Sequence, residues 1–81
     1  MCIRDSYNLG YLFIKQGNLR KAEIYLRKTI KLKSDFALAH YNLGFILKDL
    51  GELQDAKLYT QNAININPQL TDAYYSLSTM S

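Results

Sequence analysis

The sequence predicts an all-α protein built from stacked antiparallel helical hairpins. Three observations lead to this prediction: the chain repeats itself once in full, apolar residues recur at helical spacing in each copy, and a glycine interrupts each copy near its middle. No segment shows the alternation of apolar and polar residues that is typical of a strand. Each copy is therefore expected to form two helices joined by a short turn.

Composition limits the functions that the chain can have. Its 81 residues leave room for one small domain, and no apolar run approaches the roughly 20 residues that cross a bilayer. One cysteine, Cys2, excludes an internal disulfide, and one histidine, His40, excludes a His-rich metal cluster. The net charge of +3 is uneven, with +6 over residues 1–34 and −3 over residues 35–81. No secretory signal is visible, so we expect a cytoplasmic domain.

The internal repeat appears when the sequence is shifted against itself until Tyr7 coincides with Tyr41. The segment Tyr7–Gly10 then coincides with the identical segment Tyr41–Gly44. Nine of the thirty positions from residue 7 to residue 36 are identical to their counterparts, among them Gly17 with Gly51. A third copy begins in register at residue 71 and stops at residue 81.

The first helix of each copy is expected to end before Gly17 or Gly51, where a glycine can adopt the left-handed conformation of a helix C-terminus. Its apolar residues fall on one face at positions i, i+3, i+4 and i+7, which predicts a core-facing stripe. Gly10 and Gly44 lie inside these helices and are expected to let paired helices approach closely. The predicted core positions are Leu9, Leu12, Phe13 and Gln16 in the first copy, and Leu43, Ile46, Leu47 and Leu50 in the second.

The second helix of each copy is expected to open at Asn18 or Glu52, and Asn18 is the better capping residue. Pro68 ends the second copy's helix, while Ser34 stands at the equivalent place in the first. The predicted buried positions are Leu19, Ala22, Leu26, Thr29 and Ile30 in the first copy, and Leu53, Ala56, Thr60, Ala63 and Ile64 in the second.

These residues resemble the tetratricopeptide repeat family in two respects. The length of the repeat, which is the separation of Tyr7 from Tyr41, is that of the family, and the small residues, the Leu-Gly pair and the Pro follow the family pattern. The resemblance runs from Tyr7 onward and implies a right-handed α-solenoid of two full repeats plus one helix. The copies then occupy residues 7–36 and 37–70, and residues 71–81 form the first helix of a third copy or a capping helix. The departures from the family pattern are Ser6 and His40 at a frequent aromatic position, Thr29 at a small-residue position and Ser34 in place of proline.

Residues 1–6 fit the repeat badly. They can be encoded as ATG TGT ATA AGA GAC AGN, which resembles a transposon-end adapter used in sequencing libraries. We therefore expect a non-native leader joined to an internal gene fragment. The alternative is a genuine, irregular N-terminus.

No catalytic or metal-binding constellation is visible. His40 has no acidic or nucleophilic partner at helical spacing, so a packing role is favoured over that of a general base. Asp49, Glu52 and Asp55 gather around a turn but lack the spacing of a calcium loop, which favours a solvated acidic cluster. We therefore expect no enzyme, no metal and no cofactor.

The surface opposite the core stripe of each first helix is the predicted binding site. As the resemblance implies, first helices line a concave groove that grips an extended peptide or a partner helix. Aromatic residues supply contact area there, and amide side chains can bind a peptide backbone bidentately. The predicted partner-binding residues are Tyr7, Asn8, Tyr11 and Lys15 in the first copy, and Tyr41, Asn42, Phe45, Lys48 and Asp49 in the second.

Asn8 and Asn42 match the asparagine ladder of arrays similar to those of O-linked N-acetylglucosamine transferases. The alternative is that the tyrosines pack between adjacent copies and the asparagines are solvated. Chaperone-binding members of the family hold a C-terminal carboxylate with several Lys, Arg and Asn residues, and only Asn42 fits that pattern. Binding of a chaperone tail is therefore not expected.

A basic stripe on the first copy's second helix is expected to be a solvated convex face. It consists of Arg20, Lys21, Arg27, Lys28 and Lys31, and the equivalent residues of the second copy are Gln54, Asp55, Gln61, Asn62 and Asn65. A surface that follows a phosphate backbone or a membrane would continue along the repeats. We therefore expect a protein or peptide partner, not nucleic acid or membrane.

Two functional hypotheses remain open. The first is a noncatalytic interaction module that belongs to a longer array. The second is a substrate-presenting arm of a larger enzyme, such as a glycosyltransferase, whose catalytic domain lies outside these residues.

Overall fold

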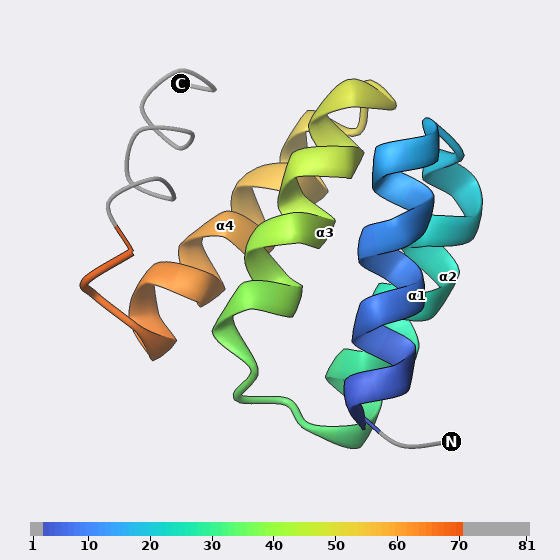
Figure 1. Cartoon of the computed structure of the whole chain (residues 1–81). Helices are drawn as coiled ribbons and strands as arrows, with labels where there is room; N and C mark the ends of the chain where they lie inside the picture. Colours follow the sequence, from blue (N-terminus) through green and yellow to red (C-terminus); the bar gives the residue numbers. More distant parts are fainter. Residues whose placement is uncertain (1–2, 71–81) are drawn as a thin grey trace.

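The computed structural model describes residues 3–70 and shows two helical hairpins placed side by side (Figure 1). Helices α1 (Ile3–Gln16) and α2 (Leu19–Leu32) form the first hairpin, and α3 (Ala37–Asp49) and α4 (Leu53–Ile66) form the second. Helix α3 packs against both α4 and α2, and it touches α1 at one edge. The part of the chain described contains no strand, which confirms the predicted all-α class.

The turns inside the two hairpins form as the glycines predict. Gly17 has φ = 80° and Gly51 has φ = 87°, a left-handed conformation that is easily adopted only by glycine. Asn18 caps α2, since its side-chain oxygen accepts a hydrogen bond from the Lys21 backbone N–H at 3.4 Å. Glu52 occupies the equivalent place before α4 but makes no side-chain capping bond.

The helices of each hairpin approach closely at the two interior glycines. A Cβ atom at Gly10 would lie 2.9 Å from Leu26 Cγ, and one at Gly44 would lie 3.0 Å from the Ala56 carbonyl oxygen. The Cβ atom at Gly44 would also overlap the Thr60 Oγ1 atom, and real Cβ atoms almost never come as near to another heavy atom as the Leu26 and Thr60 contacts would require. The expected role of these glycines in close packing is therefore confirmed.

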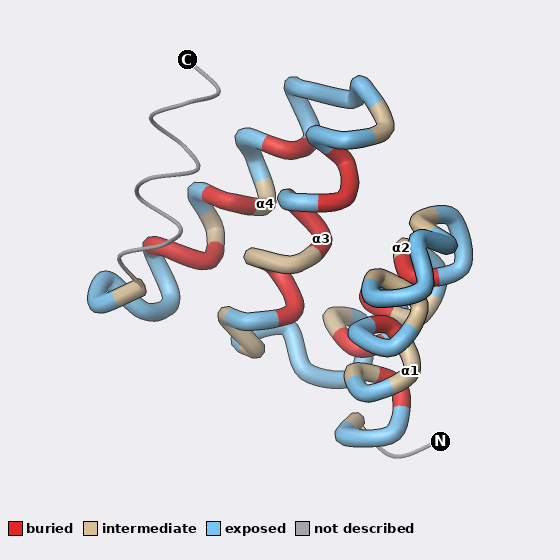
Figure 2. Tube along the Cα trace, turned by 45° about the horizontal axis from the view of Figure 1, so that its top comes forward, coloured by how far each residue is buried: buried red, intermediate tan, exposed pale blue. Residues whose placement is uncertain are grey.

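The core lies between the hairpins as well as inside them. Leu43, Ile46 and Leu47 of α3 form one buried cluster with Ala22 and Leu26 of α2. Figure 2 shows buried positions recurring along α3, whereas on α1 only Ser6 and Gly10 are buried. Helix α3 is thus the helix that contacts all three of the others within residues 3–70.

Some predicted core positions are wrong for this reason. Leu12 is 47% exposed although its equivalent, Ile46, is fully buried, because α2 covers that face of α3 and no described helix covers the same face of α1. Gln16 at the end of α1 is exposed, and so is Leu53 at the first turn of α4. Periodicity identifies an apolar stripe, but it does not show whether another element lies on it.

The first helix begins before residue 7, the predicted start of the first copy. Helix α1 starts at Ile3, and Ser6 is completely buried, so residues 3–6 continue the first helix in the described structure. The origin of residues 1–6 stays a prediction. The third copy, residues 71–81, lies outside the described residues.

None of the helices between residues 3 and 70 combines the length and the apolar character that a membrane span requires.

Candidate functional site

Some of the predicted binding residues lie along the seam where α1 meets α3. Asn42 of α3 donates a hydrogen bond from its side-chain Nδ2 to the hydroxyl of Tyr7 on α1, at 2.9 Å. These residues are 35 positions apart, so the bond joins the first helices of adjacent copies. Tyr7 and Asn42 are each half-buried, which places their polar atoms at the edge of the core.

Aromatic rings extend this seam on the α1 side. The Tyr7 ring stacks on Phe36, with 4.9 Å between ring centroids, and lies 6.5 Å from the Tyr11 ring. The Lys15 ammonium lies 5.0 Å from the centroid of Tyr11, within the range of a cation–π contact. Burial raises the pKa of Tyr7, and this outweighs the lowering by the Asn42 hydrogen bond. The Tyr7 hydroxyl is therefore neutral at physiological pH.

The structure brings only some of the predicted residues together. Tyr7, Tyr11, Lys15 and Asn42 form a continuous set of contacts. Asn8 is exposed on the side of α1 that carries Leu9 and Leu12, and no hydrogen bond joins it to Asn42 within the described residues. In the second copy Tyr41 is half-buried, Phe45 is 42% exposed, and Lys48 and Asp49 are exposed near the end of α3.

A pocket of about 610 Å³ opens at one end of the seam. Its walls are Ile3, Arg4, Tyr7, Asn8, Lys33 and Phe36. Sequence analysis missed Arg4, Lys33 and Phe36, because Arg4 lies in the presumed leader and the other two lie between helices. Phe36 carried a usable signal, since its equivalent in the second copy is the apolar Leu70.

Two comparisons with known proteins agree with this geometry. The tetratricopeptide repeat family matches residues 6–36 and again residues 37–70, two adjoining segments that follow the two hairpins. The chain belongs to the tetratricopeptide repeat family. This confirms the predicted family resemblance.

Among solved structures, the chain is similar to the protein in "Crystal structure of MamA", with a TM-score of 0.93 and 31% sequence identity. The match covers 96% of this chain and 46% of the MamA chain, so this chain spans less than half of that protein's length. No curated protein matches the sequence. Tetratricopeptide repeats are protein–protein interaction modules, whereas a specific likeness to O-linked N-acetylglucosamine transferase arrays is not among these findings.

His40 has the packing environment expected for the tetratricopeptide core. It is only 6% exposed, its Nε2 lies 2.7 Å from the Ser34 carbonyl oxygen, and its ring lies 5.8 Å from that of Tyr59. The Ser34 carbonyl oxygen is not a nucleophile that an imidazole can activate, and the contact with Tyr59 is between the two rings. Within residues 3–70, no group of three or more His, Cys, Asp or Glu side chains is arranged to hold a metal ion.

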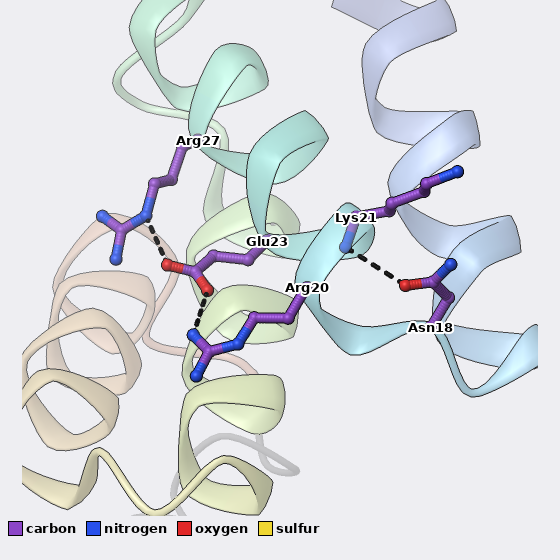
Figure 3. A network of polar contacts seen from close by, with 5 residues as sticks. All are labelled: Asn18, Arg20, Lys21, Glu23 and Arg27. Atoms are coloured by element: carbon purple, nitrogen blue, oxygen red, sulfur yellow. Dashed lines mark hydrogen bonds and ion pairs between the residues drawn. The ribbon is translucent and has the colours of Figure 1, made fainter.

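The basic stripe on α2 is partly neutralised. Glu23 accepts a hydrogen bond from Arg27 at 3.0 Å and another from Arg20 at 3.4 Å (Figure 3). Arg27 also donates to the Tyr59 hydroxyl at 3.0 Å, which ties the second helices of the two tetratricopeptide copies together. At least one cation of the stripe thus serves the packing of one repeat on the next.

Proposed function

We propose that this chain is a noncatalytic interaction module whose first helices, α1 and α3, bind an extended peptide or a partner protein in their concave groove. The observation that carries the proposal is the Tyr7–Asn42 hydrogen bond, which fixes a groove amide between two copies. Membership of a family of interaction modules supports it independently.

The Asn42 side chain keeps the groups that a peptide backbone needs. Its bond to Tyr7 uses one N–H, which leaves the second N–H and the Oδ1 acceptor. A peptide N–H can donate to Oδ1 while the neighbouring peptide carbonyl accepts from Nδ2. Because the Tyr7 bond limits rotation of the amide, less side-chain entropy is lost when the peptide binds.

Tyr11 and Phe45 supply apolar contact area beside this amide. Both are more than 40% exposed, although both are large aromatic side chains. Such rings give much contact for few rotatable bonds. The proposed partner is thus a peptide whose backbone meets Asn42 and whose apolar side chains meet the two rings.

We further propose that the chain is part of a longer array, with copies at residues 7–36 and 37–70, a third beginning at residue 71, and a non-native leader at residues 1–6. The exposure of the apolar Leu12 on α1 supports this proposal. So does the MamA match, which extends over less than half of that protein. An uninterrupted read of the parent gene across both ends tests it. A start codon with a ribosome-binding site at Met1 would contradict the leader.

The same read tests the second candidate, a substrate-presenting arm of a glycosyltransferase-like enzyme. That candidate is favoured by one observation, the repetition of asparagine at Asn8 and Asn42. A catalytic domain following the repeats would support it. Further repeats followed by a stop codon would contradict it, and only the interaction-module hypothesis would remain.

The groove proposal is tested with the amide itself. Peptides that bind the chain are selected from a random-peptide library, and their affinities are measured by fluorescence anisotropy. Asn42→Ala should weaken binding about tenfold, since it removes two hydrogen bonds to the peptide. Asn65→Ala, on the exposed surface of α4, is the matched control and should leave the affinity unchanged. Equal affinities for Asn42→Ala and the unsubstituted chain would refute the groove proposal.

A further inference from the structure

The second helices of the two copies, α2 and α4, each carry an exposed apolar residue at the same place in the repeat. Ile24 on α2 is 53% exposed, and its equivalent on α4, Leu58, is 55% exposed. At about 100° per residue, each lies on the side of its helix opposite a fully buried alanine, Ala22 or Ala56. Single exposed apolar residues are common on protein surfaces. Here the exposure recurs at one position in two adjacent copies.

The residues beside this apolar position differ in charge between the two helices. On α2 they are cations, and at the equivalent positions of α4 they are uncharged amides. All of them are exposed and share the outward side of their helix with the apolar residue. Together these residues form the outer site, which consists of Arg20, Ile24 and Lys31 on α2 and Gln54, Leu58 and Asn65 on α4.

The positive charge of the outer site is not balanced within α2. This helix carries five Lys or Arg residues and one acid, Glu23. Glu23 accepts hydrogen bonds from both Arg20 and Arg27, so one carboxylate serves two guanidinium groups. Lys31 belongs to neither of the ion pairs recorded within residues 3–70. The α2 half of the outer site therefore attracts a negatively charged surface.

A helix suits the outer site better than an extended peptide does. The backbone groups inside α2 and α4 are already used by their own helices, so the outer site offers no free edge to which an extended backbone can bond. A helical segment satisfies its own backbone hydrogen bonds and can present two apolar side chains on one face.

We propose that the outer site binds an amphipathic helix of a partner protein, with two apolar side chains against Ile24 and Leu58 and with acidic residues at the end that meets Arg20 and Lys31. The end that meets α4 carries uncharged polar residues. This proposal goes beyond the peptide groove, because it uses no residue of α1 or α3. A chain that binds at both surfaces joins two partners.

The change from cations to amides favours a protein over a nucleic acid or a membrane. A phosphate backbone carries a charge at every nucleotide, and an anionic lipid surface is charged throughout. Either would be bound best by cations on both outer helices, whereas α4 has Gln54 and Asn65 at the equivalent positions. A protein helix can carry its acids at one end only.

The test measures binding of the full chain to three synthetic helical peptides by fluorescence anisotropy at low salt. The peptides share an apolar face with two leucines and differ only at two polar positions beside the first leucine, which are both Glu, both Gln or both Lys. The Glu peptide should bind about fivefold more tightly than the Gln peptide, as expected for two exposed ion pairs. The Lys peptide should bind most weakly, and the differences should shrink at high salt.

Substitutions locate the binding. Lys31→Glu should transfer the preference from the Glu peptide to the Lys peptide. Lys57→Glu makes the same charge change at an exposed position of α4 outside the outer site, and it should keep the original preference. Ile24→Ser should weaken the Glu peptide about fivefold, because an apolar contact is lost. Leu12→Ser, which changes a similarly exposed residue on α1, is its control and should leave the affinity unchanged.

Several results would overturn the outer site. Equal affinities for the Glu and Gln peptides would do so, as would equal effects of Lys31→Glu and Lys57→Glu or no binding by any of the three peptides. Stronger competition by phosphatidylglycerol vesicles or by oligouridine than by unlabelled Glu peptide would overturn it in favour of a membrane or a nucleic acid.

The groove and the outer site can fail separately. Asn42→Ala should leave the affinity for the Glu peptide unchanged, because Asn42 lies on α3. A loss in this variant as large as that in Ile24→Ser would place the peptide in the groove and overturn the outer site. Unchanged binding of groove peptides by Asn42→Ala, together with the Glu preference described above, would refute the groove and leave the outer site in place.

Discussion

At the scale of single residues, the hydroxyl of Tyr7 has a role that its ring does not share. The ring packs on Phe36, while the hydroxyl accepts the hydrogen bond from Asn42 and so joins the two copies. An amide at the edge of a core that loses its partner is costly, because it gives up a hydrogen bond without full access to water. Stability and binding should therefore both depend on one oxygen atom.

We expect Tyr7→Phe to lower the free energy of unfolding by about 1 kcal/mol, since it keeps the ring stacking and removes one hydrogen bond. Urea denaturation followed by circular dichroism measures this change. Tyr11→Phe is the control, because Tyr11 is 45% exposed and its contacts with Tyr7 and Lys15 involve the ring. Similar losses in the two variants would show that the Tyr7–Asn42 bond contributes nothing.

At the scale of helices, each hairpin depends on a glycine, but the two glycines are not equally replaceable. A Cβ atom at Gly10 would lie 2.9 Å from Leu26 Cγ, but its nearest backbone neighbour, the Ala22 carbonyl oxygen, would lie at an ordinary 3.5 Å. A Cβ atom at Gly44 meets the Ala56 carbonyl oxygen at 3.0 Å and the Thr60 backbone nitrogen at 3.2 Å, which belong to α4 and cannot move alone. The second hairpin is therefore the more tightly constrained.

Gly44→Ala is expected to destabilise the chain by about 2 kcal/mol, because the separation of α3 from α4 costs more than alanine's helix propensity returns. Gly10→Ala should change stability by less than about 1 kcal/mol. The gain in helix propensity and the cost of the new contact with the Leu26 side chain oppose each other. Thermal and urea unfolding of the two variants give the comparison. A larger loss of stability for Gly10→Ala than for Gly44→Ala would show that the first hairpin is the more tightly constrained.

The helices were largely predictable from the sequence, and the coverage of their faces was not. Gly17, Gly51 and Asn18 mark local boundaries, because their effects come from backbone geometry within a few residues. Burial of Leu12 depends on which helix lies next to it, and periodicity carries no information on that neighbour. The pocket was missed for a different reason, since Arg4 is far from Lys33 and Phe36 in the sequence and they meet only when α1, α2 and the segment after α2 are folded together.

At the scale of the whole molecule, the two copies have similar sequences but different positions in the stack. Helix α3 contacts the other three described helices, whereas α1 packs mainly on α2 and leaves Leu12 exposed within residues 3–70. The same residue position therefore contributes differently to stability in each copy. Measurements at equivalent positions show this difference directly.

Ile46→Ala should cost about 3 kcal/mol, as expected for a fully buried aliphatic side chain that leaves a cavity. Leu12→Ala, at the equivalent position of the first copy, should cost less than about 1 kcal/mol, because Leu12 is already 47% exposed. Chemical denaturation of both variants tests this asymmetry. Equal costs would mean that another element covers α1 in solution.

The Tyr7–Asn42 bond also determines how many oriented amide side chains a row of such repeats can present. An amide of one copy is oriented by a tyrosine of the copy before it, so orientation is a property of the joint between copies. The first copy of a stack has no such joint; within residues 3–70 no copy is described before that of Asn8, and the Asn8 side chain is exposed. A row of repeats thus offers one oriented amide fewer than it has members, and a solitary repeat offers none.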